Sequence, residues 1–194
     1  VETTGLLLLI GGWLDEIVEG ERNGLILSFG VITLMMMIGL RSVPMGAWSM
    51  VPNAFPLLAL AAGLGFLWTT IDSDTLVVAM MAIGIGVDDT IHFLMRYRIE
   101  FSKDVPGESL DIEKRRERAL QTTFSFAGRA IIMTTIILAL GYLPLALSEY
   151  YSMWMLGVMM PVVLVLALLA DLLLVPALLQ LGIGEPKLTG TNDS

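Results

Sequence analysis

Long apolar runs dominate this sequence, and they restrict the possible fold more than any other feature. The 194 residues are 56% hydrophobic and only 15% charged, whereas a soluble domain has roughly 25% charged residues. A run of about 18 or more apolar residues can cross a bilayer as a helix, which satisfies its own backbone hydrogen bonds. We therefore predict an all-α polytopic membrane protein with five transmembrane helices, at about residues 23–40, 46–70, 75–97, 121–147 and 152–180.

Three polar segments surround this five-helix block, which covers residues 23–181. Residues 1–22 join a short apolar patch to an acidic amphipathic stretch, which predicts either the end of an extracytoplasmic domain leading into the first span or a helix at the membrane surface. Residues 98–120 form a basic loop whose second half, DIEKRRERAL, is typical of an exposed amphipathic helix, and residues 182–194 form a polar tail. Because the chain starts with Val1 and shows no signal peptide, we expect it to be part of a longer protein.

The distribution of lysine and arginine predicts how the spans are oriented, because cytoplasmic connections carry an excess of these residues. The loop between the third and fourth spans is rich in them, and Arg41 and Lys187 lie on the same side if the spans alternate. The opposite side has only Arg22 among many carboxylates. We predict a multi-pass protein of the inner or plasma membrane with its N-terminus outside and its C-terminus in the cytoplasm.

The third span has two adjacent carboxylates, Asp88 and Asp89, near its middle. An isolated charge at that depth costs roughly 2.5–3.5 kcal/mol, so ionisable residues there are functional candidates by default. His92, the only histidine, follows Asp88 by four residues and can touch either carboxylate on a helix. Two carboxylates this close should not both stay ionised in a low-dielectric site. The cluster therefore predicts a proton relay, and the alternative is a polar group that neighbouring helices satisfy without any chemistry.

Small and polar residues near this cluster are candidate supports. Gly84 and Gly86 precede the carboxylates, and small residues let a neighbouring helix approach closely, which would help the fourth span to reach them. The fourth span offers Thr134 and Thr135 at a comparable depth, with Arg129 closer to the cytoplasmic end and within reach of the interface. We predict that Thr134 belongs to the proton relay with Asp88, Asp89 and His92, and that the other residues support it.

Asp171, in the fifth span, is a further carboxylate within an apolar run. It is either a second functional group or a protonated residue buried by packing, and we favour the second interpretation.

Composition and spacing exclude several other classes of site. A net charge of −8 argues against nucleic acid as a partner, which requires a basic surface. The chain has no cysteine, so disulfides and thiolate metal sites are absent. Asp88, Asp89 and His92 are neighbours on one helix and cannot complete a coordination shell alone, so we predict no metal and no cofactor.

Three blocks of the sequence together resemble the resistance–nodulation–division (RND) superfamily, and most closely its lipid-exporter-like branch, which includes the MMPL and hopanoid-exporter groups. The blocks are MAIGIGVDDTIHFLMRYR, GRAIIMTTIILALGYLPLAL and ALLADLLLVPALL. The resemblance covers nearly the whole chain. It implies an exporter of hydrophobic or lipid-like substrates, driven by the proton motive force and built from two halves, with this chain as the C-terminal transmembrane block.

The resemblance also implies roles for individual residues and a set of partners. In such transporters a carboxylate on the third helix of the block carries the proton, which maps onto Asp88 and Asp89. A hydroxyl on the next helix assists and maps onto Thr134, and Arg129 matches a basic position near the end of that helix. The implied partners are membrane lipid, the N-terminal half and extracytoplasmic domains of the same transporter, a hydrophobic substrate and further copies in an oligomer.

The sequence departs from one branch of the superfamily. Drug-efflux members have the aspartate pair in the first half of the protein, whereas the polar tail here favours the second half.

Two alternatives to a transporter remain at this point. A sterol-sensing-like membrane scaffold shares the five-helix architecture, so the fold alone does not settle transport. An intramembrane aspartyl enzyme needs two carboxylates on separate helices, which adjacent Asp88 and Asp89 do not provide. We therefore expect no enzymatic activity.

Overall fold

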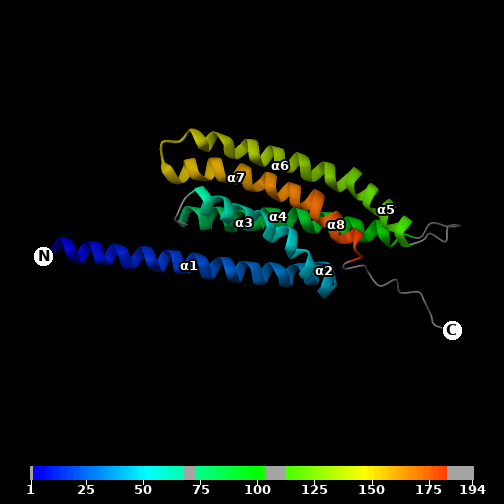
Figure 1. The fold of residues 1–194 in the computed structure, drawn as a ribbon, viewed down its shortest axis with the longest axis horizontal. Coiled ribbons are helices and arrows are strands. Elements are labelled where there is room, and N and C mark those ends of the chain that lie inside the picture. Colours follow the sequence, from blue (N-terminus) through cyan, green and yellow to red (C-terminus); the bar gives the residue numbers. More distant parts are fainter. Residues whose placement is uncertain (1, 68–72, 104–111, 183–194) are drawn as a thin grey trace.

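The computed structural model describes residues 2–67, 73–103 and 112–182. In these ranges the chain is almost entirely helical and contains no strand, and the helices form an elongated bundle (Figure 1). The fold class is the predicted one, an all-α polytopic membrane protein. Five helical segments of the described chain are long and apolar enough to cross a membrane, namely Gly11–Gly39, Val43–Phe66, Ser73–Phe101, Ile112–Leu147 and Tyr151–Gln180.

Helix α1 (Glu2–Gly39) is a single continuous helix, and no break separates its first twenty residues from the first span. Its 38 residues correspond to about 57 Å at about 1.5 Å per residue, nearly twice the roughly 30 Å of the hydrocarbon core. Its N-terminal part extends past the other helices (Figure 1).

The turn after α1 has the hydrogen bonds of a Schellman motif, in which the backbone changes to the left-handed conformation. The N–H of Ser42 donates to the carbonyl of Met37 (3.2 Å), and the N–H of Arg41 donates to the carbonyl of Ile38 (3.1 Å). Arg41 has a φ of +47°, a conformation that glycine usually supplies at this position.

The second span consists of two helices, α2 (Val43–Trp48) and α3 (Met50–Leu67), and starts slightly before the predicted residue 46. The Ser42 hydroxyl accepts a hydrogen bond from the N–H of Met45 (3.5 Å) and caps α2. Gly46 lies so close to α1 that a Cβ there would be 2.6 Å from the Met37 backbone, so only glycine fits. The predicted end of this span, at residues 68–70, lies outside the described residues.

The remaining three spans follow the predicted ranges and differ mainly at their ends. The third is α4 (Ser73–Phe101), which runs four residues past the predicted end at residue 97. The amphipathic helix predicted in the basic loop is α5, which buries Ala119 and Leu120 and continues directly into the fourth span. The rest of that loop, at residues 104–111, and the tail at 183–194 with Lys187 lie outside the described residues.

The fourth and fifth spans each consist of several helical segments. The fourth span is α5 (Ile112–Thr123), the π-helical turn η1 (Phe124–Gly128), α6 (Arg129–Tyr142) and the 3-10 turn η2 (Leu143–Leu147). The fifth span is α7 (Tyr151–Leu169), the π-helical turn η3 (Ala170–Leu174) and α8 (Val175–Gln180).

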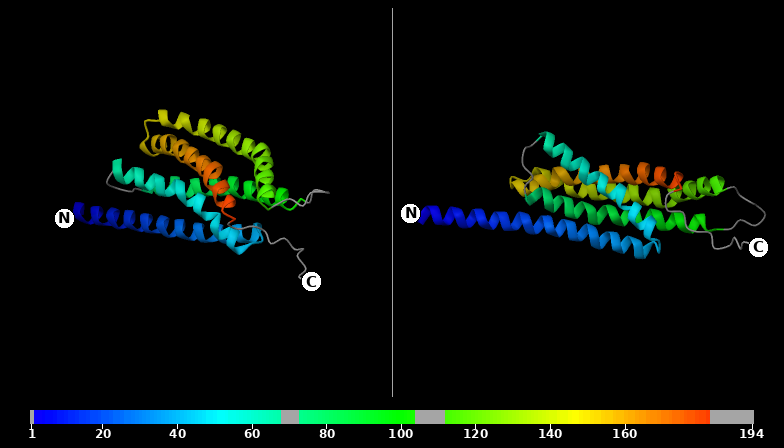
Figure 2. Two further views of the ribbon diagram at one scale, coloured as in Figure 1. Left: turned by 45° about the vertical axis from the view of Figure 1, so that its right-hand side comes forward. Right: turned by 60° about the horizontal axis from the view of Figure 1, so that its bottom comes forward.

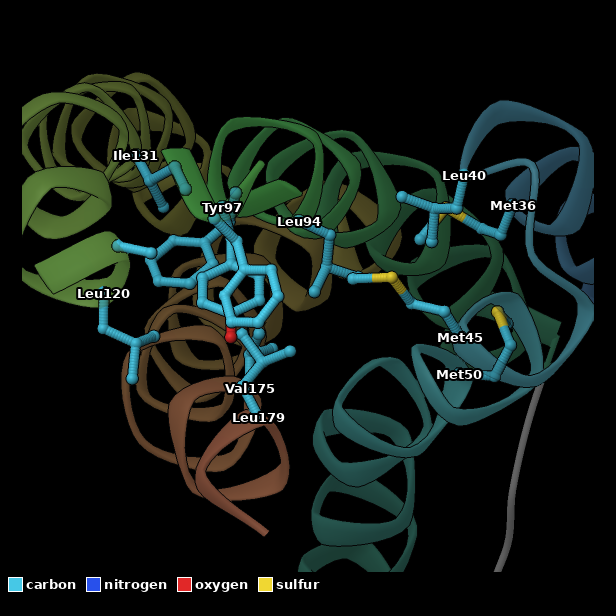
Figure 3. Close-up of a cluster of buried hydrophobic side chains, with 13 residues drawn as sticks. Met36, Leu40, Met45, Met50, Leu94, Tyr97, Leu120, Ile131, Val175 and Leu179 are labelled. Atoms are coloured by element: carbon cyan, nitrogen blue, oxygen red, sulfur yellow. The ribbon is translucent and has the colours of Figure 1, made fainter. Parts of the chain in front are cut away.

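Helix α4 lies at the centre of the bundle. It packs against α1, α3, α5 and α7, whereas α6 packs mainly against α7 (Figures 1 and 2). Apolar side chains fill the bundle in two separate clusters. The cluster in Figure 3 lies at the end of the bundle that carries α2, α5 and α8, and includes Met36, Leu40, Leu94, Tyr97, Val175 and Leu179. The other cluster comprises Leu60, Leu64, Val78, Ala82, Met160, Val163 and Leu164.

Candidate functional site

The middle of α4 presents three consecutive polar residues to different surroundings. Asp88, Asp89 and Thr90 lie near the centre of a 29-residue helix, and consecutive helical residues point about 100° apart. Asp88 therefore faces one side of the helix and Thr90 nearly the opposite side. The side chain of Asp88 is 72% exposed, whereas Thr90 is fully buried.

Asp88 and His92 form a contact on the exposed side of α4, which we call the open face. The His92 Nε2 atom lies 3.4 Å from Asp88 Oδ1, and the two side chains are 71% and 72% exposed. This is the contact between residues four apart that the sequence spacing allows. Because the separation is at the long end of hydrogen-bonding distances, the pair is loosely held and both groups stay accessible.

The open face borders a cleft of about 410 Å³ between α4 and the fourth span. All four residues of the predicted relay are among its lining groups, so the fold brings together side chains that the sequence places more than forty residues apart. The cleft is lined by Asp88, Asp89, His92, Arg96, Ala127, Ala130, Ile131 and Thr134.

Thr134 shares this cleft without a hydrogen bond to either carboxylate. Its hydroxyl lies 2.9 Å from the carbonyl of Ile131 and 3.2 Å from that of Ala130, so it bonds to its own helix. Its neighbour Thr135 is buried, and Arg129 is exposed and does not line the cleft.

Arg96 is the one cation among the described residues that line the cleft. The Arg96 guanidinium lies 2.8 Å from Glu100 Oε1 and 4.9 Å from the centre of the Phe126 ring. Glu100 is nearly buried and is also 2.7 Å from Lys103 Nζ. Glu100 is thus shared by two cations, and these contacts hold the Arg96 side chain in the wall of the cleft.

The two glycines before the carboxylates have different surroundings. A Cβ on Gly86 would lie 3.4 Å from Asn53 Oδ1 and 3.8 Å from Ala167 Cβ, so α3 and α7 approach α4 closely here. The fourth span does not make this approach, contrary to the expectation from sequence. Gly84 has nothing within 4 Å of its Cβ position.

A hydrogen-bonded network occupies the opposite, buried side of α4, which carries Gly86 and Thr90 and which we call the closed face. The Thr90 hydroxyl lies 2.6 Å from Asp171 Oδ1, 3.1 Å from Asn53 Oδ1 and 3.1 Å from the carbonyl of Gly86. The Asn53 amide nitrogen donates to the carbonyl of Ser49 (2.9 Å), which directs its oxygen toward Thr90. A hydroxyl has a single proton to donate, so this arrangement is best satisfied when the Asp171 carboxyl is protonated and donates to Thr90.

The sequence does not predict this network. Its local pattern does not single out Thr90 or Asn53, and it favours a packing role for Asp171 over a functional one. Asp171 is 2% exposed, so its burial agrees with that interpretation, but its bond to Thr90 is specific. The available signal was the presence of Asn53 and Asp171, two polar residues inside otherwise apolar runs.

Asp171 lies in a wide turn of the fifth span. The N–H of Val175 donates to the carbonyl of Ala170, five residues earlier, which is the π-helical pattern. Such turns are rare and are frequent at functional sites. Apolar residues seal the network on both sides along each helix, with Ala82 and Phe93 flanking it on α4 and Leu164 and Val175 flanking it on the fifth span.

Comparison with known proteins identifies the family. The sequence profile of the MMPL family matches residues 17–189, most of the chain. The chain belongs to the MMPL family. The three sequence blocks that resemble the RND superfamily all lie inside the matched range, so the predicted relationship to its MMPL branch is confirmed.

Two relatives share this MMPL region. The hopanoid transporter HpnN of Burkholderia multivorans is 26% identical over 193 residues, which cover 98% of this chain and 21% of HpnN. MJ1562 of Methanocaldococcus jannaschii, named as a membrane protein, is 24% identical over 168 residues, which cover 86% of this chain and 41% of MJ1562. The chain therefore spans less than half the length of either relative. No solved structure gives a significant match.

In this MMPL-family chain the polar groups of the site are carboxylates, a histidine, hydroxyls, the Asn53 amide and the Arg96 guanidinium. Within the described ranges, no three histidine, aspartate or glutamate side chains gather closely enough to hold a metal ion. The groups present can bind, hold and transfer protons.

Proposed function

We propose that this chain is the C-terminal transmembrane block of an RND-type exporter of hydrophobic or lipid-like substrates, driven by the proton motive force. Membership of the MMPL family supports transport, and the relative HpnN is named a hopanoid transporter. The observation that carries the proposal is the open cleft in which Asp88, Asp89 and His92 face Thr134 near the middle of a spanning helix.

In the proposed mechanism, Asp88 and Asp89 take up a proton from the outside and release it to the cytoplasm, with His92 assisting the transfer. Protonation removes a negative charge from the cleft and so favours closer packing of α4 against the fourth span, while deprotonation favours opening. Each charge that moves through 100 mV supplies about 2.3 kcal/mol, which is enough to shift a two-state equilibrium about 50-fold. Thr134 can turn its hydroxyl from its own helix to a carboxylate as the cleft closes.

The orientation and the missing partners form part of the same proposal. The end of the bundle that carries Arg41, Arg98 and α5 lies in the cytoplasm, since cytoplasmic connections are enriched in basic residues. The open face of α4 and the exposed side of α6 meet the N-terminal half of the transporter. The extracytoplasmic domains handle the substrate, and the full transporter assembles as an oligomer.

The test is neutralisation of the two carboxylates in the full-length protein, reconstituted in proteoliposomes with an imposed pH gradient. We expect Asp88→Asn and Asp89→Asn together to reduce proton-coupled lipid export at least tenfold, because the cleft then has no carboxylate to load. Proton flux and lipid export are measured in the same vesicles.

Glu149→Gln is the matched control, because Glu149 is an exposed acid in the turn between the fourth and fifth spans. It should export normally. Undiminished proton-coupled export by the double variant would overturn the relay. If neither the native protein nor the variants export but partner binding is kept, the sterol-sensing-like scaffold is the better interpretation.

A further inference from the structure

A second cleft, of about 570 Å³, lies between the end of α1 and the end of α4, at the end of the bundle that carries Arg41, Arg98 and Lys103. Its charged lining residues are all cations, and aliphatic or small residues make up most of the remainder. The lining includes Arg41, Arg98, Lys103, Met95, Ile99 and Ser102.

Two of the three cations have no acidic partner among the residues that the structure describes. Lys103 Nζ lies 2.7 Å from Glu100 Oε1, a carboxylate that Lys103 shares with Arg96. Neither Arg41 nor Arg98 forms an ion pair with any carboxylate in the part of the chain that the structure describes. The cleft therefore combines an excess of positive charge with two guanidinium groups, which match the geometry of a phosphate group.

The backbone of Arg41 gives a second, independent indication. Its φ of +47° places it in the left-handed region, which disfavours a residue with a Cβ and is open to glycine. A strained residue of this kind is a reason to suspect a function at that position. An arginine in place of glycine at the end of α1 directs a charged side chain to this cleft at the expense of backbone strain.

The cleft continues into an apolar surface. Met95 and Ile99, on the same face of α4, are 44% and 53% exposed, and Ile38 near the end of α1 is also exposed. Arg41 and Arg98 lie at the ends of the first and third candidate spans, the level at which lipid phosphates meet the hydrocarbon core. A ligand held here would therefore have an anionic group beside the arginines and a hydrocarbon part along α4.

We propose that this cleft is a binding site for an anionic phospholipid, with its phosphate between Arg41 and Arg98 and its acyl chains along Met95 and Ile99. Ser102 supplies a hydroxyl to the same headgroup. This site is separate from the carboxylate cleft, and it does not depend on whether the protein transports protons. A basic residue near a membrane surface contributes about 1 kcal/mol to the binding of anionic lipid, so loss of one arginine should weaken binding about fivefold.

The experiment uses the full-length protein in nanodiscs that contain a trace of photoactivatable phosphatidylglycerol in phosphatidylcholine. The yield of crosslink to the peptide that carries Met95 and Ile99 is measured by mass spectrometry. We expect Arg98→Gln and Arg41→Gly each to lower this yield about fivefold. Because Arg41→Gly relieves the left-handed backbone, its thermal stability should be equal to or higher than that of the native protein, so reduced binding cannot be attributed to misfolding.

Lys114→Gln is the matched control, since Lys114 is an exposed cation of α5 at the same end of the bundle. It should keep the native yield. Three results would overturn the lipid site: an equal decrease for Lys114→Gln, an equal yield with photoactivatable phosphatidylcholine, or complete displacement by inorganic phosphate at matched ionic strength. The last result would indicate that the cleft binds free phosphate and that the acyl chains contribute nothing.

Discussion

Two faces of α4 at the same depth carry polar groups that differ in exposure: one set is open and the other is buried. On the open face, Asp88 and His92 are loosely paired, highly exposed and border a cleft. On the closed face, Thr90 and Asp171 are buried, and Thr90 Oγ1 lies 2.6 Å from Asp171 Oδ1. The first arrangement leaves groups free to exchange protons, whereas the second joins the fifth span to α4 through a short hydrogen bond. Residue type alone does not distinguish these uses, because a carboxylate occurs on each face.

Asp89 lies between the two faces. It lines the open cleft and directly precedes Thr90 in the chain. It is therefore the carboxylate of the pair that lies nearer to the closed-face network.

The largest expected effect on stability comes from removing the hydroxyl at the centre of the closed face. Thr90→Val keeps the shape of the side chain but leaves the buried Asp171 carboxyl and the Asn53 oxygen without their shared partner. An unsatisfied buried polar group costs about 1–3 kcal/mol, so we expect a loss of about 3 kcal/mol in the free energy of unfolding, measured by denaturant titration in detergent micelles.

Thr134→Val is the control for this change, because the Thr134 hydroxyl bonds only to its own helix, and it should cost less than about 0.5 kcal/mol. Replacing both partners by apolar groups is close to neutral, so the double variant Thr90→Val with Asp171→Leu should recover the part of the loss that comes from the unpaired carboxyl, while the Asn53 oxygen stays unpaired. Equal losses for the two threonine variants would show that the closed face is no more tightly held than the open one.

An intermediate effect is expected where α3 and α7 approach α4. Gly86→Leu forces a side chain into the space beside Asn53 and Ala167, and overpacking of this kind typically costs about 1–3 kcal/mol. Gly84→Leu places the same side chain where nothing lies within 4 Å of the Cβ position. We expect a loss of about 2 kcal/mol for the first variant and none for the second, in the same titration. A stable Gly86→Leu protein would contradict the tight packing of the closed face.

The smallest expected effect on stability is on the open face. Asp88→Ala removes one member of an exposed pair, and exposed pairs contribute about 0–1 kcal/mol. The free energy of unfolding should change by less than about 0.5 kcal/mol, while circular dichroism confirms unchanged helix content. A large loss would mean that Asp88 is structural and would weaken the contrast between the two faces.

The sequence predicted those features that depend on local pattern. The five spans follow from the length of the apolar runs, and the contact between Asp88 and His92 follows from the helical repeat. The amphipathic helix α5 was likewise visible in DIEKRRERAL. The roles assigned to Asp88, Asp89, His92 and Thr134 stay predictions, although all four residues line one cleft.

The features that sequence did not predict depend on contacts between distant helices. Thr90 and Asp171 are 81 residues apart, and no local pattern indicates that the two side chains meet. Which side of α4 is closed depends on the approach of α3 and α7 at Gly86, and a glycine in an apolar run does not reveal which helix will approach. The sequence likewise does not predict the left-handed Arg41 or the close contact of Gly46 with the Met37 backbone, because the contact is between two helices.

The length of α1 has a mechanical consequence. Met36 and Leu40 lie in the apolar cluster of Figure 3, and the Glu21 carboxylate accepts a hydrogen bond from the Ser73 hydroxyl at the start of α4 (2.6 Å). Residues 2–20, about 28 Å of helix, therefore extend beyond the last of these contacts. A tilt of about 10° around Glu21 displaces the Glu2 end by about 5 Å, so a small movement where α1 meets the start of α4 becomes a movement the size of a helical turn at the N-terminal end.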